Sequence, residues 1–172
     1  NRAPGNPGKA LEVGTGFGNG DKMQITGVDV AFNGAVETGF GDFSVNWTNS
    51  FIMDYLVEVE GGGAATNTAG WAGQPQLKSV VTTKYTVGDH SIAWNMNYTD
   101  STYEDQETGS LDSWLIHNLS YTYDIGSYGR VMAGINNVTD EDPVLSSDGK
   151  YEDPNLYNNY GREYTLRYSI SF

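Results

Sequence analysis

Three groups of residues have the types that phosphate binding, metal binding or hydrolysis would require. The first is the glycine-rich stretch GTGFGNG at residues 14–20. A glycine loop of this kind binds phosphate when a strand precedes it and a helix follows it. The residues that follow here have the pattern of a strand, so we expect a surface loop and no phosphate site.

The second group is acidic and includes Asp140, Glu141, Asp142 and Asp148. Carboxylate oxygens suit calcium, but the spacing does not fit the EF-hand pattern and Pro143 interrupts it. We therefore expect no dedicated metal site and no cofactor. A divalent cation that bridges the acidic loops stays an open alternative.

The third group is His90 and His117, which could form a hydrolase triad with Ser and Asp residues that converge on them in space. His90 begins a strand pattern beside a tight turn, and His117 lies within an apolar face. A structural role for both histidines is the better interpretation. A hydrolase built around His117 is the alternative, but we expect no enzymatic activity.

Aromatic residues in the long polar segments are better candidates for a binding role. Binding residues tend to lie in loops on a rigid scaffold, and aromatic faces suit sugars and flat chelates alike. Packing within the loops is the competing interpretation. The candidate ligand-binding residues are Trp71, Tyr103, Tyr151, Tyr157 and Tyr160.

The composition of the 172-residue chain favours strands and turns. Its 22 glycines, 12 tyrosines and four tryptophans point this way because aromatics favour strands and glycine favours turns. No apolar run approaches the roughly 20 residues of a membrane helix. The formal net charge of −13 argues against a nucleic-acid partner, which needs clustered Lys and Arg. The chain has no cysteine, which excludes a disulfide framework and a thiolate metal site.

Strict alternation of apolar and polar residues predicts about seven or eight β-strands, because successive side chains of a strand point to opposite faces. In the last stretch, Glu163, Arg167 and three hydroxyl residues oppose a face formed by Tyr164, Leu166, Tyr168, Ile170 and Phe172. In the stretch 42–57 we expect the odd positions, through Tyr55 and Val57, to share one apolar face. The other alternating stretches are 28–36, 77–87, 90–98, 115–125, 131–135 and, most weakly, 11–17.

The connections between these stretches alternate in length. Short turns containing glycine lie at 38–41, 88–89 and 126–127, and long polar segments at 58–76, 100–112 and 139–162. Such alternation is typical of an up-and-down outer-membrane barrel, with tight periplasmic turns and longer outside loops. It places the end of the last strand on the periplasmic side.

The apolar faces could meet either a second sheet, as in a soluble sandwich, or lipid, as in a barrel whose strands are all paired. Aromatic residues concentrate towards the strand ends, as in the girdle at a membrane interface, and the mean hydropathy is only −0.47. These features favour a transmembrane barrel with water inside. The aromatics are Trp47, Tyr55, Trp94, Tyr98, Trp114, Tyr121, Tyr123, Tyr164, Tyr168 and Phe172.

The opposite faces are rich in Ser, Thr and Asn and poor in charge. A closed barrel of about eight strands is just wide enough for side chains to fill, and polar groups buried there would need a fully satisfied network. Small hydroxyls and amides suit a wide, wet lumen better. We therefore expect a piece of a larger barrel.

Several motifs resemble those of TonB-dependent outer-membrane receptors. Residues 131–143, VMAGINNVTDEDP, are similar to the penultimate strand and loop start of these receptors, which often read gvNNlfDxxP. Residues 160–172, YGREYTLRYSISF, resemble their last strand. GVDV at 27–30 and YTY at 121–123 resemble two further strand motifs. The resemblance covers about residues 10–172, but the plug domain and the TonB box, which lie N-terminal in the family, are not in the chain.

The resemblance implies that residues 1–172 form the C-terminal segment of the β-barrel domain, roughly the last eight of 22 strands. It implies an outer-membrane receptor of a Gram-negative bacterium that imports a scarce nutrient: a metal chelate, a vitamin or a saccharide. Its expected partners are outer-membrane lipid, a small-molecule ligand and TonB, which would bind through the missing N-terminal part. The alternative is a self-contained eight-stranded outer-membrane barrel with a structural or adhesion role.

The last strand also resembles the assembly signal of outer-membrane proteins. An unpaired edge strand is a template for another strand, and its apolar face can enter lipid only once its backbone is paired. We expect the barrel-assembly machinery to recognise this strand. The residues concerned are Tyr164, Leu166, Tyr168, Ile170 and Phe172.

Overall fold

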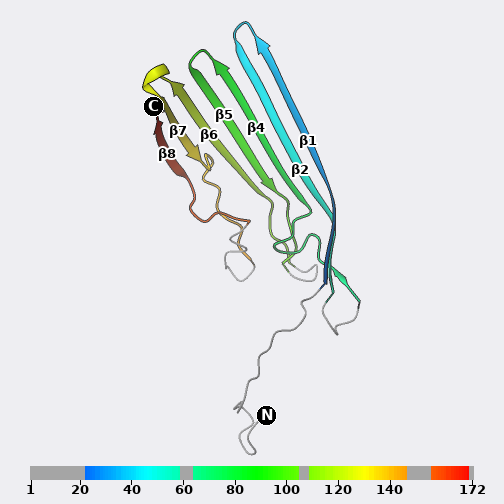
Figure 1. Ribbon diagram of the computed structural model, residues 1–172. Helices are drawn as coiled ribbons and strands as arrows, with labels where there is room; N and C mark the ends of the chain where they lie inside the picture. Colours follow the sequence, from blue (N-terminus) through cyan, green and yellow to red (C-terminus); the bar gives the residue numbers. More distant parts are fainter. Residues whose placement is uncertain (1–21, 59–63, 105–108, 147–155, 171–172) are drawn as a thin grey trace, which may run out of the picture.

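The computed structural model describes residues 22–58, 64–104, 109–146 and 156–170, which form one antiparallel β-sheet (Figure 1). Hydrogen-bonded neighbours follow the order β1-β2-β4-β5-β6-β7-β8, and β3 adds to β2. The all-β, up-and-down prediction is confirmed. The strands are β1 (Lys22–Thr38), β2 (Gly41–Glu58), β3 (Thr66–Asn67), β4 (Leu77–Val87), β5 (His90–Thr99), β6 (Trp114–Asp124), β7 (Arg130–Asn136) and β8 (Glu163–Ser169).

The predicted alternation of short and long connections is also confirmed. The β1–β2 and β4–β5 turns and the 3-10 turn η1 (Gly126–Tyr128) gather at one end of the sheet, which we call the short-turn end (Figure 1). The long connections lie at the opposite, long-segment end. Gly41 is required at the first turn because its φ is 141° and a Cβ there would lie 2.5 Å from the Tyr85 ring.

The two faces of the sheet follow the predicted alternation along most of its width. Cross-strand partners place Phe32, Trp47, Val81 and Met96 on the same side, because paired residues share a face. We call this side the apolar face. It comprises the even residues 28–38, the odd residues 41–51 and 77–87, the even residues 90–98, the odd residues 115–123 and 131–135, and the even residues 164–168. The intervening residues form the polar face.

The predicted single face of residues 42–57 is wrong beyond Phe51. Gly27 pairs with Ile52 whereas Thr26 pairs with Asp54, so one extra residue enters β2 at this point. Such a β-bulge changes which side chains face which side. Tyr55 and Val57 consequently lie on the side opposite Phe43–Phe51, where the β1–β2 hairpin extends beyond β4 and β2 pairs with β3 instead.

Trp114 was expected among the aromatic residues of the girdle but lies on the polar face. It occupies an even position of β6, whereas both tyrosines occupy odd positions on the apolar face. Its ring is buried, with 7% of its surface exposed, against residues of the β7–β8 connection. The girdle assignment of Trp114 is therefore wrong.

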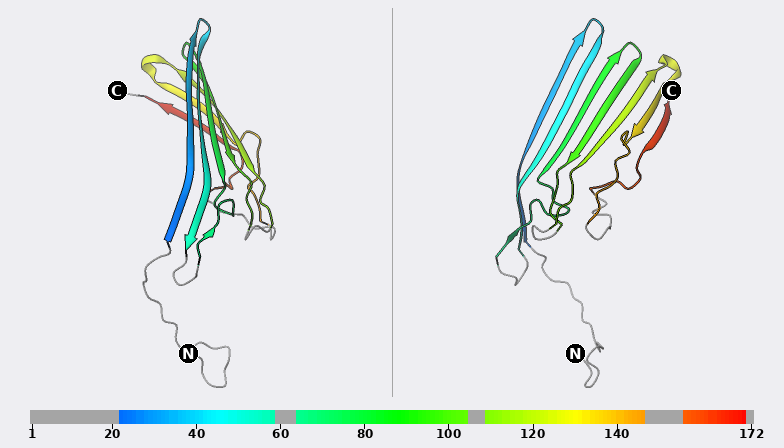
Figure 2. Two further views of the ribbon diagram at one scale, coloured as in Figure 1. Left: turned by 90° about the vertical axis from the view of Figure 1, so that its right-hand side faces the viewer. Right: turned by 180° about the vertical axis from the view of Figure 1, so that it is seen from behind.

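Little of the described chain is buried. Figure 2 shows the sheet edge-on as a single twisted layer, and the buried hydrophobic residues all lie at its long-segment end: Leu111, Trp114, Ile116 and Tyr157. Within the described ranges, no helix has the length and apolar character needed to cross a membrane. The weakest predicted strand, 11–17, the glycine-rich stretch 14–20, Tyr151, Asp148 and Phe172 lie outside the described residues.

Candidate functional site

The apolar face carries no Asp, Glu, Lys or Arg at any of its described positions. Its large side chains are nevertheless open to the surroundings: Phe32 is 55% exposed, Ile92 47% and Leu166 79%. Every charged residue in the same stretch of the strands lies on the polar face. These are Asp29, Glu37, Asp42, Lys78, Lys84, Asp124, Arg130, Glu163 and Arg167.

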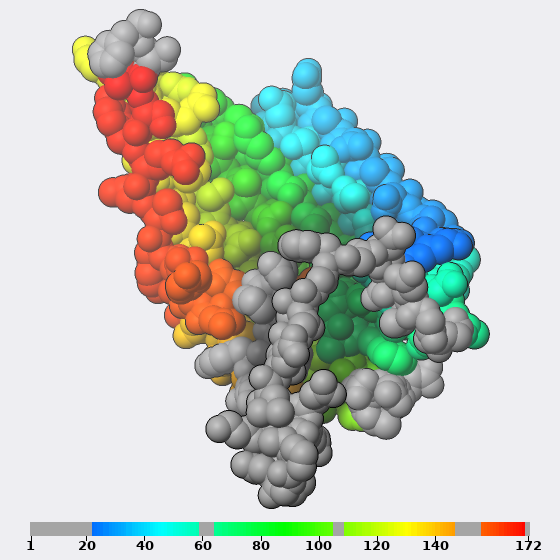
Figure 3. Space-filling view, turned by 60° about the horizontal axis from the view of Figure 1, so that its bottom comes forward, coloured from blue at the N-terminus to red at the C-terminus, as the bar shows by residue number. Residues whose placement is uncertain are grey.

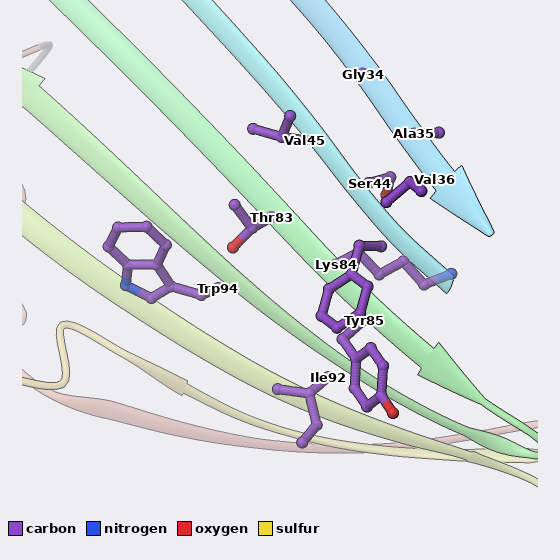
Figure 4. A pocket seen from close by; sticks show the side chains of 11 residues that line it. Gly34, Ala35, Val36, Ser44, Val45, Thr83, Lys84, Tyr85, Ile92 and Trp94 are labelled. Carbon is purple, nitrogen blue, oxygen red and sulfur yellow. The ribbon is translucent and has the colours of Figure 1, made fainter. Parts of the chain in front are cut away.

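A shallow trough crosses the apolar face at β1, β2 and β4 (Figure 4). It measures about 490 Å³ and follows the row Gly34, Val45 and Thr83, whose side chains are small. The next row contains Phe43 and Tyr85, whose ring centroids are 4.5 Å apart. The trough exists because glycine at position 34 supplies no side chain between larger neighbours.

Aromatic side chains of the apolar face gather at the short-turn end, where three tyrosine hydroxyls have polar partners. The Tyr85 hydroxyl donates to the Phe40 carbonyl at 2.6 Å, and the Tyr168 hydroxyl donates to the Tyr128 carbonyl. The Tyr121 hydroxyl lies 2.6 Å from Nδ1 of His90. Each ring thus has its apolar body on the sheet and its polar tip at the turns.

Each histidine ring stacks on an aromatic side chain of a neighbouring strand. The His90 ring stacks on Tyr123 with ring centroids 4.8 Å apart, and the His117 ring stacks on Trp94 at 5.6 Å. Neither ring hydrogen-bonds a described carboxylate or serine. The positions agree with the structural interpretation of the two residues, while the absence of catalysis stays a prediction.

The polar face carries a chain of side-chain amides that runs across β4, β5 and β6 to the start of the β7–β8 connection. Asn95 Nδ2 donates to Thr82 Oγ1 at 2.9 Å, while Asn95 Oδ1 accepts from Asn97 at 2.6 Å and from Asn118 at 3.1 Å. Asn118 Oδ1 in turn accepts the backbone N–H of Asn137 at 2.9 Å. One amide thus fixes the orientation of two others.

Asn137 anchors the β7–β8 connection. It has a positive φ of 52°, a conformation that Asn tolerates better than most residues. Its side chain donates to the Glu141 carbonyl and accepts the Glu141 N–H, each at 2.8 Å. Sequence reasoning assigned no role to Asn118 or Asn137. Asn137 follows another Asn at the end of an alternating stretch, and this asparagine pair was the available signal.

Two pockets hollow the polar face. One, of about 790 Å³, lies at the short-turn end and includes Lys84, Arg130 and Arg167 in its lining. Arg130 there pairs with Asp124 at 2.9 Å. The other, of about 430 Å³, lies at the long-segment end between β5, β6, β7 and the residues that precede β8. We call the second one the amide pocket because asparagine side chains dominate its lining.

The amide pocket is bounded on one side by a small hydrophobic cluster. Trp114 and Tyr157 meet edge to face with ring centroids 5.4 Å apart, and Ile116, Val144 and Leu156 pack around them. The Trp114 indole N–H donates to the Asp142 carbonyl at 3.0 Å. The cluster thus fixes both ends of the β7–β8 connection against β6.

The four predicted ligand-binding aromatics that the structure describes have different surroundings. Trp71 and Tyr103 are brought together by a backbone bridge, in which the Tyr103 N–H donates to the Gly70 carbonyl at 2.8 Å. Tyr157 is 2% exposed and belongs to the hydrophobic cluster. Tyr103 and Tyr160 are open, at 47% and 81% exposure, so a binding role for them stays a prediction.

The acidic candidates are dispersed in the part of the chain that the structure describes. Asp140 faces Arg162, whose backbone N–H donates to Asp140 Oδ1 at 2.9 Å and whose guanidinium lies 3.9 Å from Oδ2. Among the described residues, no group of three or more His, Asp or Glu is placed to hold a metal ion.

In comparisons with known proteins, no family model, no curated protein and no solved structure matches the chain. The sheet and its two faces are therefore the basis for any functional conclusion. Figure 3 shows the strands side by side, from β8 in red to β1 in blue, as one continuous surface.

Proposed function

We propose that the chain is part of an outer-membrane β-barrel receptor that takes up a scarce nutrient through TonB. The segregation of charge supports the membrane barrel, and the sequence resemblance to TonB-dependent receptors supports the rest of the proposal. A sheet face that is free of charge and open to its surroundings is expected where the solvent is lipid, since a charged side chain at the bilayer midplane costs about 2–4 kcal/mol.

The tyrosine-rich short-turn end supports a membrane interface. Outer-membrane barrels have an apolar band about 25 Å tall between two aromatic girdles. From His90 to Tyr98 the apolar face of β5 spans eight residue steps, which is about 26 Å along the strand. Strand tilt reduces this height somewhat, and Tyr98 at the other end of the apolar face of β5 completes a band of suitable size.

A larger barrel accounts for the two edges of the sheet. Within the described residues, β1 pairs only with β2, and β8 pairs only with β7. Unpaired strand edges are not tolerated in lipid, so further strands would complete the barrel on both sides. The proposed barrel has 22 strands, in keeping with the resemblance to TonB-dependent receptors.

A water-filled interior suits the polar face. Most of its amides and hydroxyls are half-buried or exposed, and its charged residues lie mostly near the two ends of the strands. A narrow eight-stranded interior would need a satisfied partner for each of these groups. The self-contained barrel with a structural or adhesion role is thus the second candidate, favoured only by a chain length sufficient for eight strands.

The experiment is performed with the full-length protein expressed in a Gram-negative host. We expect it in the outer-membrane fraction, as heat-modifiable folded material, and we expect it to bind the purified periplasmic domain of TonB. Absence from the outer membrane would refute the barrel. Outer-membrane insertion without TonB binding, together with a signal peptide directly upstream of Asn1, would favour the eight-stranded alternative.

A further inference from the structure

The amide pocket presents mainly uncharged hydrogen-bonding groups. Its polar lining comes from Asn97 on β5, Asn118 on β6, Asn136 at the end of β7, and Asn158. Each amide offers a donor and an acceptor on the same planar group. A sugar hydroxyl also both donates and accepts, so a wall of amides is complementary to a row of hydroxyls.

The amides are positioned before any ligand arrives. Asn95 lies outside the pocket and holds Asn97 and Asn118 by accepting a hydrogen bond from each. Asn118 is further fixed because its Oδ1 accepts the Asn137 N–H. A prepositioned wall reduces the entropy that ligand binding would otherwise cost.

Part of this wall is left open for a ligand. The Asn136 side chain is exposed and makes no hydrogen bond to the described residues. The Asn97 Nδ2 is used by Asn95, while its Oδ1 has no described donor. Trp114, Ile116 and Leu156 supply an apolar boundary, which suits the apolar C–H face of a sugar ring.

The charge distribution selects against an anionic ligand. Glu163 is the sole charged residue among those that line the amide pocket. The cationic groups Lys84, Arg130 and Arg167 line the separate pocket at the short-turn end. With a formal net charge of −13 over the chain, a trianionic iron chelate would meet repulsion from the chain as a whole and would find no cation among the residues that line this pocket.

From these observations we infer that the amide pocket binds a neutral, polyhydroxylated ligand, of the class of oligosaccharides. The inference rests on the proposed receptor function and narrows its ligand from the metal chelates, vitamins and saccharides that the family resemblance leaves open. Asn136 and Asn97 bind ring hydroxyls, and Glu163 accepts from a vicinal pair.

The test uses the full-length protein in detergent, titrated by calorimetry with maltopentaose, cellopentaose and laminaripentaose, and with a trianionic ferric tricatecholate. We expect at least one oligosaccharide to bind. Asn136→Leu should weaken that binding about tenfold, as expected for two lost hydrogen bonds. Asn33→Leu, the same change on the polar face of β1, should leave it unchanged.

A third variant separates neutral from cationic ligands. Glu163→Gln keeps one of the two acceptor oxygens and removes the charge, so oligosaccharide affinity should fall by about tenfold or less, whereas a cationic ligand would be lost. The inference is overturned if no oligosaccharide binds at millimolar concentration, if Asn136→Leu has no effect, or if the ferric chelate binds and Asn136→Leu weakens it. The same preparation is first shown to bind TonB and to come from the outer membrane, so that failure of the receptor proposal is recognised separately.

Discussion

Replacing Val45 by arginine places a charge at the centre of the apolar face. Val45 belongs to the row that contains Trp94, and Trp94 lies four residues from His90 and four from Tyr98, the aromatic limits of the face on β5. The row thus lies at the middle of the proposed lipid-facing band. Ser44→Arg introduces the same side chain one residue away on the polar face, so it is the matched control.

The expected loss in the free energy of unfolding follows from the depth of Val45 in the proposed band. Arginine near the bilayer midplane of a barrel costs about 2–4 kcal/mol, which lowers the folding equilibrium constant about 30- to 1,000-fold. The valine that is lost is only half-buried, so the loss of packing adds little. Ser44 is exposed, and its replacement should change the free energy of unfolding by less than about 0.5 kcal/mol.

The assay is urea-induced unfolding of the full-length protein in lipid vesicles, with the folded fraction measured by the heat-dependent shift on a gel. We expect Val45→Arg to lower the unfolding midpoint clearly and Ser44→Arg to leave it near that of the parent. Equal effects of the two substitutions would refute the assignment of the faces. A larger effect of Ser44→Arg would show that the polar face is the one buried.

Further predictions concern the loops, the anchor residue and the last strand. Protease added to intact cells should cut within residues 140–153, whereas cleavage only after lysis would reverse the proposed topology. Asn137→Ala should lower the stability of the β7–β8 connection by about 1–3 kcal/mol, as measured by hydrogen exchange, because it removes both hydrogen bonds to Glu141. Asn137→Gly is the control that removes the same bonds without straining the backbone at a positive φ. Unchanged hydrogen exchange in both variants would contradict the anchoring role. Deleting Phe172 should reduce the amount of surface-exposed folded protein far more than Tyr168→Ala does. Normal assembly of the variant that lacks Phe172 would show that the barrel-assembly machinery does not recognise this residue.

The strands and their faces could be predicted from the sequence because alternation is a local property of the chain. Because alternation is local, it could not reveal the β-bulge in β2. Apolar residues continue at Met53, Tyr55 and Val57, so the pattern looks uninterrupted, although one extra residue has entered β2. Only the pairing with β1 reveals the change, and pairing depends on residues far apart in the chain.

The candidate binding site could be predicted only in part, for the same reason. Tyr157 and Trp114 are 43 residues apart and gain their common cluster from the path of the β7–β8 connection, which no local pattern specifies. In the sequence, nothing distinguishes Asn95, Asn97 and Asn118 from the other residues of the polar face. Their mutual hydrogen bonds follow from the register between β5 and β6, where Asn95 pairs with Asn118.

The central claim, that the apolar face meets lipid and the polar face meets water, is tested most directly by spin labels along β2. The 172 residues contain no cysteine, so single cysteines at positions 42–51 can be labelled one at a time in the full-length protein after any upstream cysteines have been replaced. In lipid bilayers, we predict that labels at odd positions collide with lipid-soluble oxygen and labels at even positions with a water-soluble nickel complex. Collision rates without a period of two, or with oxygen favouring the even positions, would contradict the account.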